Sequence, residues 1–139
     1  MEAAADYQRV LECNVEDDGA RALGEALKVN TALRHLNLDL NSIGDYGARA
    51  LGQALKVNKT LTRLDVSDNE IGEYSRDNDG RAPWIKTPEG PAALAQAIGE
   101  NTSVKWLGVS GNGLGPDCGK ALAVALATNQ SITTVCRSF

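Results

Sequence analysis

The amino-acid sequence predicts a short right-handed α/β solenoid, with a parallel sheet on its concave side and helices on the outside. The first observation is a repeated apolar frame, because the pattern L-x-x-L-x-L-x-x-N-x-I-G at 33–44 returns at 61–72 with Val66 replacing one Leu. The second is that the segment 19–30, GARALGEALKVN, recurs almost unchanged at 47–58. Its apolar residues have helical spacing, and strand, helix and strand at this distance form a right-handed parallel crossover.

The repeats keep a constant spacing, with one exception. Leu33 and Leu61 are equivalent residues 28 positions apart, and the same spacing links Val104 to Ile132. Between Leu61 and Val104 the distance is 43 residues, which is 15 more than the regular spacing. The surplus lies at about 73–89, where a strand leads into its helix. We therefore expect one inserted loop at 73–89 in an otherwise regular stack.

Helices are expected at equivalent places in each repeat. Four apolar residues of the segment 19–29 share one helical face: Ala22, Leu23, Ala26 and Leu27. Each predicted helix ends at an asparagine, at Asn30, Asn58, Asn101 and Asn129. Asparagine tolerates the left-handed conformation that often ends a helix, so we expect that conformation here. In the third helix, Thr87 is the expected N-cap and Pro88 the expected first residue. Residues 1–16 resemble a degraded first repeat.

A second set of asparagines follows the predicted strands, at Asn41, Asn69 and Asn112. A side-chain amide both donates and accepts hydrogen bonds. Stacked amides can therefore satisfy the backbone groups left free where each strand turns away. We interpret these residues as a structural ladder and not as catalytic groups.

Length and composition favour a single domain over residues 1–139. The hydrophobic share is 42% and the aromatic share only 4%, so the core is expected to be aliphatic. The net charge of −4 weighs against a nucleic-acid or anionic-membrane surface as the main role. The first residues, MEAAADYQRVLE, contain acids, and no segment approaches the roughly 18 apolar residues of a membrane span. We therefore expect an unexported, cytoplasmic protein.

The sequence offers no metal, cofactor or catalytic motif. Cys13, Cys118 and Cys136 lack metal-ligand spacing, and we expect Cys13 and Cys118 to be buried structural thiols. The segment 77–80, DNDG, does not fit a calcium loop, because Lys86 would occupy the position of the final bidentate Glu. We predict that the chain is not an enzyme and that it has no metal site and no cofactor.

The repeat frame, the N-x-I-G turn and the GA(R)ALG(E/Q)ALKVN segment resemble leucine-rich repeats of the ribonuclease-inhibitor class. They are similar to the repeats at the C-terminal end of NOD-like receptors; the Ran GTPase-activating protein and tropomodulin share the repeat class. The resemblance implies a horseshoe fragment that binds other proteins on its concave face or rims. The chain has about three complete repeats and no nucleotide-binding or death-fold segment, so the resemblance does not extend to receptor signalling.

Strand alternation predicts which side chains face the concave side, because neighbours of the inward leucines point the other way. The expected exposed positions are Tyr7, Arg9 and Leu11; His35, Asn37 and Asp39; Arg63, Asp65 and Ser67; Trp106, Gly108 and Ser110; and Thr134 and Cys136. The partner-binding candidates among them are His35, Asp39, Arg63, Asp65 and Trp106. Trp106 is the strongest, since exposed tryptophans often anchor interfaces. Alternatively, it covers a neighbouring strand or packs under the inserted loop. His35 has no nucleophile or carboxylate placed beside it by a motif, which favours a surface residue over a base.

The inserted loop supplies two further candidates, Tyr74 and Trp84. Pro83 and Pro88 stiffen the loop, and a loop at this rim borders the concave face. The alternative is a tolerated insertion without a role.

Three functions remain open. The first is a scaffold that binds an unknown protein partner through the concave face and the 73–89 loop. The second is a regulator similar to a GTPase-activating protein. The third is a self-associating module, in which the terminal strand from Ile132 to Cys136 pairs with a second copy to form a homodimer.

Overall fold

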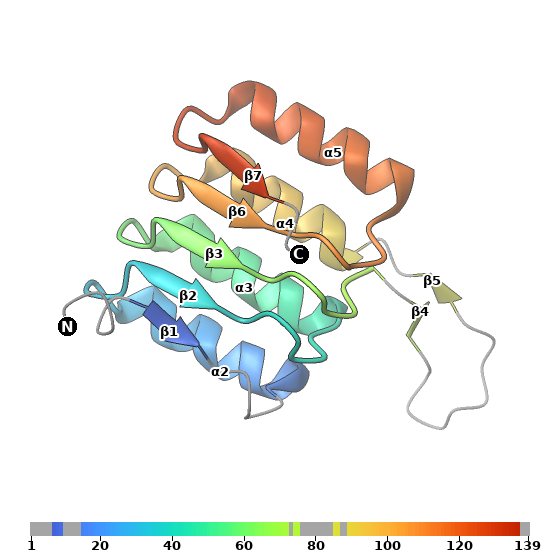
Figure 1. The fold of residues 1–139 in the computed structure, drawn as a ribbon, viewed down its shortest axis with the longest axis horizontal. Coiled ribbons are helices and arrows are strands. Elements are labelled where there is room, and N and C mark those ends of the chain that lie inside the picture. Colours follow the sequence, from blue (N-terminus) through green and yellow to red (C-terminus); the bar gives the residue numbers. More distant parts are fainter. Residues whose placement is uncertain (1–6, 10–14, 73, 76–84, 87–88, 137–139) are drawn as a thin grey trace.

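The computed structural model describes residues 7–9, 15–72, 74–75, 85–86 and 89–136. Five short parallel strands form one sheet in the order β1-β2-β3-β6-β7. The strands are β1 (Tyr7–Arg9), β2 (His35–Asn37), β3 (Arg63–Asp65), β6 (Trp106–Gly108) and β7 (Thr134–Cys136). The helices are α2 (Glu16–Val29), α3 (Asp45–Val57), α4 (Glu89–Glu100) and α5 (Gly115–Thr128). The helices form a second layer behind the sheet, as the predicted solenoid requires (Figure 1).

The apolar frame of the sequence sets the register of the sheet. Leu36 lies opposite Leu64, and Leu64 lies opposite Leu107. All three side chains are buried in one aliphatic core with the inner faces of the helices. The prediction that equivalent leucines of successive repeats are neighbours in one parallel sheet is therefore confirmed.

The predicted asparagine ladder is present in the turns after the strands. The Asn69 side-chain oxygen accepts hydrogen bonds from the backbone nitrogens of Asn41 and Ile43, both at 3.0 Å. Its amide nitrogen donates to the carbonyl oxygens of Leu38 and Val66, both at 2.9 Å. Each such amide therefore connects its own turn to that of the preceding repeat.

The expected left-handed conformation at the helix ends is wrong. Asn58 has an extended backbone, with φ −69° and ψ 129°, and Asn30 and Asn129 are also extended. The Asn58 side chain instead donates to Leu27 O at 2.8 Å and accepts from Leu61 N at 2.8 Å. Asn101 and Asn129 make the equivalent bonds. These asparagines therefore form a second ladder at the other end of the strands.

Two aspartates connect neighbouring helices. The Asp17 Oδ1 atom accepts hydrogen bonds from Gly44 N at 2.8 Å and Gly47 N at 2.9 Å, at the start of α3. Asp45 accepts in the same way from Gly72 N and Gly90 N. A carboxylate satisfies free backbone N–H groups at a helix start and is favoured there by the helix dipole.

The first helix, α2, differs from its prediction in where it begins and in which of its apolar residues are buried. It begins at Glu16, three residues earlier than the segment 19–29, and Ala22 and Ala26 are exposed although they share a face with buried Leu27. No described helix lies on the far side of α2, so these alanines have no neighbour to cover them.

The inserted segment contains a small hairpin, which the sequence did not predict. Its strands are β4 (Tyr74–Ser75) and β5 (Ile85–Lys86), which pair antiparallel and extend away from the stack (Figure 1). The predicted cap at Thr87 and Pro88 lies outside the described residues, as does Cys13. Cys118 is buried, as predicted. Among the described residues, no helix is long and apolar enough to cross a membrane.

Candidate functional site

Three of the predicted contact residues form a row across the concave sheet. His35 lies opposite Arg63 in the register of β2 and β3, and Arg63 lies opposite Trp106 in the register of β3 and β6. Each is partly exposed. The parallel stacking of successive repeats therefore places an imidazole, a guanidinium and an indole side by side.

Arg63 and Trp106 contact each other directly. The guanidinium carbon of Arg63 lies 3.9 Å from the centroid of the Trp106 ring, which is a cation–π arrangement. A guanidinium over an aromatic face can still donate hydrogen bonds from its in-plane N–H groups. No ion pair found among the described residues involves Arg63.

The indole of Trp106 also lies close to the sheet at Gly108. A Cβ atom added to Gly108 would lie 2.9 Å from Trp106 Cη2 and 2.5 Å from Asp65 Oδ1. The absence of a side chain at Gly108 therefore gives the indole its space. Trp106 is therefore partly exposed while its ring lies against the backbone of its own strand, and its role as a binding anchor stays a prediction.

The structure corrects the exposure predicted for the second half of the concave face. Asp65 is 9% exposed, Asn37 is 6% exposed and Ser67 is 0% exposed. Asp65 Oδ1 accepts a hydrogen bond from Ser67 N at 2.9 Å, and Asn37 Oδ1 accepts one from Asp39 N at 3.0 Å. These side chains turn back onto the backbone where the strands end, so alternation alone overestimated their exposure. Asp39 is partly buried, and Gly108 is buried.

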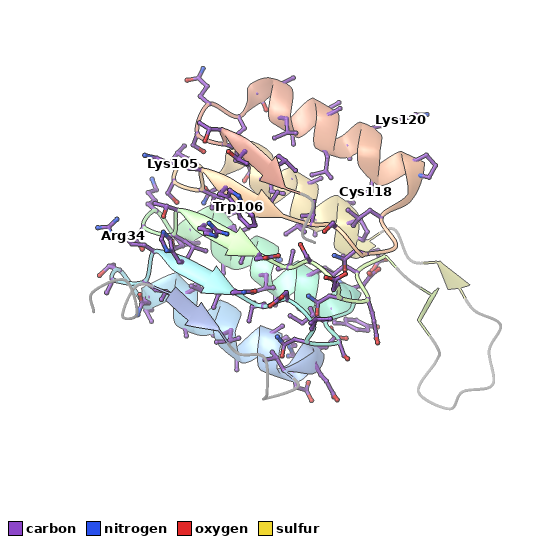
Figure 2. All side chains as sticks on the ribbon, in the orientation of Figure 1. Arg34, Lys105, Trp106, Cys118 and Lys120 are labelled. Carbon is purple, nitrogen blue, oxygen red and sulfur yellow. The ribbon has the colours of Figure 1, made fainter. Side chains whose placement is uncertain are left out.

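Two exposed cations that were not predicted from the sequence lie beside the row. Arg34 and Lys105 each precede a strand by one residue and are exposed (Figure 2). The Arg34 carbonyl accepts hydrogen bonds from Thr62 N and Arg63 N, and the Thr62 carbonyl accepts them from Lys105 N and Trp106 N. The positions before the strands are thus stacked in register, and reading one residue upstream of the row would have identified the two cations.

The loop candidates stay predictions. Tyr74 lies in β4, where the structure describes the backbone, and Trp84 lies outside the described residues. Within the described part of the chain, no group of three or more His, Cys, Asp or Glu side chains could hold a metal ion.

Comparisons with known proteins agree with this architecture. A family model described as Leucine Rich repeat matches residues 29–52 and 57–73. No curated protein sequence matches the chain.

Two solved structures are similar over most of the chain. A structure titled leiomodin-1 actin-binding site 2 has a TM-score of 0.71 at 23% identity, covering 88% of this chain and 64% of that one. The tropomodulin C-terminal domain from Caenorhabditis elegans has a TM-score of 0.68 at 22% identity, covering 88% of this chain and 66% of that one. The chain thus spans just under two thirds of either structure. The ribonuclease-inhibitor class and the likeness to NOD-like receptors stay predictions. At these identities the likeness shows the fold: the chain carries leucine-rich repeats and folds as a short α/β leucine-rich-repeat solenoid.

Proposed function

We propose that the chain is a protein-binding module whose concave face contacts its partner around Trp106 and Arg63. The observation that carries the proposal is their stacked, partly exposed pair, 3.9 Å apart, in the middle of the sheet. Tryptophan and arginine are enriched among the few residues that dominate binding energy at protein interfaces. His35 continues the same row on the next strand.

The scaffold around this pair is suited to recognition. The three strands are held by backbone pairing and by two asparagine ladders, so the row is preorganised before a partner arrives. Preorganisation lowers the entropy lost on binding. In this proposal the hairpin formed by β4 and β5, with Tyr74 and Trp84, forms a second contact region beside the face.

Actin is the first named protein to test. The leiomodin-1 structure is titled as an actin-binding site, and its likeness to this chain is one of fold. Co-sedimentation with actin filaments and titration with actin monomers test this partner directly. Regulation of a GTPase is the second candidate from the sequence, and the repeats are its only support.

A matched pair of variants tests the face itself, whichever protein binds. Trp106→Ala removes the concave aromatic residue, and Tyr46→Ala removes an exposed aromatic residue from helix α3 on the outer layer. With actin, or with a partner identified by cross-linking to the immobilised chain, we expect Trp106→Ala to weaken binding at least about tenfold. Tyr46→Ala should bind as the unmodified chain does. Equal binding by all three proteins would contradict the proposal.

A further inference from the structure

Unpaired positive charge gathers where the chain enters the strands. We call the four residues Arg34, Lys59, Arg63 and Lys105 the basic rim. Arg34, Lys59 and Lys105 are exposed, and Arg63 is partly exposed. They come from three successive repeats, and Arg34 and Lys105 lie at the same edge of the sheet beside Trp106 (Figure 2).

The basic rim is not neutralised within the described chain. The ion pairs found there involve other cations, in Arg21–Asp18, Lys28–Glu25 and Arg49–Glu89. Among the described residues, no acidic residue occupies the two stacked rows that contain Arg34 and Arg63; the equivalent position before β1, Asp6, lies outside them. Glu100, at the end of α4, accepts a hydrogen bond from Gln96 on its own helix.

Many carboxylates of the described repeats lie at the opposite end of the strands or in the first turns of the helices, among them Glu16, Asp17, Asp18, Asp45, Asp68, Glu70 and Glu89. Acids at helix starts are explained by the helix dipole. The same effect explains Lys28 and Lys56 in the last turns of α2 and α3. It does not explain Arg34 and Lys105, because each lies five residues beyond the end of its helix and the effect fades within one turn.

The backbone positions that carry Arg34 and Lys105 are held at a fixed spacing. Thr62 Oγ1 donates to Arg34 O at 3.1 Å, and Thr133 Oγ1 donates to Lys105 O at 3.2 Å. Arg34 and Lys105 precede β2 and β6, which are two strand spacings apart, or about 10 Å. Three residues of an extended peptide span about the same distance. In the polyproline II conformation, which has three residues per turn and rises about 3.1 Å per residue, acidic side chains three residues apart share one face and would match the two cations.

We propose that the basic rim and the Arg63–Trp106 pair bind an acidic, extended segment of a protein partner that crosses the strands. Carboxylates meet Arg34 and Lys105, while Arg63 donates from the edge of its guanidinium to a third carboxylate. The exposed part of the Trp106 indole receives an apolar residue of the segment. This proposal rests on the proposed function and adds the chemistry of the partner.

A protein segment fits this surface better than a nucleic acid does. The chain has a net charge of −4, which repels a polyanion at long range, whereas a short acidic segment senses mainly the local cations. Recognition of nucleic acid also generally uses a larger cationic surface than the four residues of the basic rim.

The test uses the full chain and a short fluorescein-labelled peptide with glutamate at every third position and one leucine at its centre. Arg34→Gln with Lys105→Gln removes two charges of the basic rim. The matched control, Arg21→Gln with Lys120→Gln, removes one Arg and one Lys from the helices. Both double variants change the formal net charge from −4 to −6. A peptide with glutamine in place of glutamate and a short single-stranded DNA serve as further probes.

We expect the rim variant to bind the acidic peptide about tenfold more weakly in fluorescence anisotropy, at low ionic strength, while the control changes little. The unmodified chain should bind the glutamine peptide no more tightly than the rim variant binds the acidic peptide. Equal losses in both double variants, equal binding of both peptides, or tighter binding of DNA would overturn the proposal.

The same variants separate this proposal from the proposed function. Trp106→Ala could abolish binding of the native partner while the rim variant still binds it. That result would support binding by the concave face and contradict an acidic segment on the basic rim. If the rim variant no longer binds the partner while Trp106→Ala still binds it, the proposed contact of Trp106 with the partner is contradicted.

Discussion

The same position of the repeat is buried in the middle of the stack and exposed at its C-terminal end. Leu55 in α3 is 2% exposed, whereas its equivalent Leu126 in α5 is 37% exposed. Leu64 in β3 is 0% exposed, whereas its equivalent Val135 in β7 is 47% exposed. The residue types are similar in each pair, so the neighbouring repeat decides how much apolar area is buried.

Burial in the first helix, α2, also depends on a neighbouring repeat, here at the N-terminal end of the stack. Ala54 and Ala97 are buried between neighbouring helices, but the equivalent Ala26 in α2 is exposed. An interior helix is covered on both sides, and a terminal one on a single side. Stability in a stack of this kind is a sum over repeats and their interfaces, so equivalent substitutions should cost different amounts along the chain.

The largest expected difference is between Leu64→Ala and Val135→Ala. Leu64→Ala opens a cavity in the aliphatic core and should lower the free energy of unfolding by roughly 2–5 kcal/mol. Val135→Ala removes a half-exposed side chain and should cost less than about 1 kcal/mol. Urea unfolding of both variants measures the difference. A loss below about 1 kcal/mol for Leu64→Ala would contradict its inward position.

The next comparison concerns the asparagines at the helix ends. Asn58 is buried, and its side chain bonds Leu27 O, Thr60 N and Leu61 N. Asn58→Ala leaves buried backbone groups without partners and should cost about 2–3 kcal/mol. Asn30→Ala should cost about 1 kcal/mol or less, because water can reach the groups that exposed Asn30 caps. Similar urea midpoints for the two variants would show that the second ladder contributes little.

The third comparison concerns two glycines whose replacement by alanine should have effects of opposite sign. A Cβ atom at Gly24 would lie 2.9 Å from Ala50 O in the next helix, whereas one at Gly119 would meet no described atom within 4 Å. Gly24→Ala should therefore destabilise the chain by about 1–2 kcal/mol through overpacking. Gly119→Ala should stabilise it by about 0.5–1 kcal/mol through helix propensity. Thermal unfolding gives both signs, and stabilisation by Gly24→Ala would mean that the helices are not closely packed there.

The sequence predicted the features that recur in each repeat. It did not predict several contacts that one repeat makes with another in space. The frame of Leu36, Leu64 and Leu107 predicted the sheet, because equivalent residues of a repeat must stack in register. The extended Asn58 cap and the aspartate bridges between helices were missed, since each acts on backbone groups of another repeat. The hairpin formed by β4 and β5 was missed because its strands are two residues each and have no periodicity to detect.

The candidate site was predicted in part for the same reason. Alternation correctly placed Arg63 and Trp106 on the concave side but also placed Asp65 in solvent. The return of the Asp65 carboxylate to Ser67 N is a local hydrogen bond that alternation does not include. Arg34 and Lys105 became visible as a pair when the stacking of the repeats placed them at one edge of the sheet.

The central claim is that Trp106 is open to solvent in the free chain and covered when the partner binds. The sequence has two tryptophans, so Trp84→Phe leaves Trp106 as the single fluorophore of its type. Acrylamide quenching of this variant should be substantial in the free chain and should fall when the acidic peptide is added, with no such fall for the glutamine peptide. Quenching that is negligible in the free chain, or unchanged by bound peptide, would contradict the account.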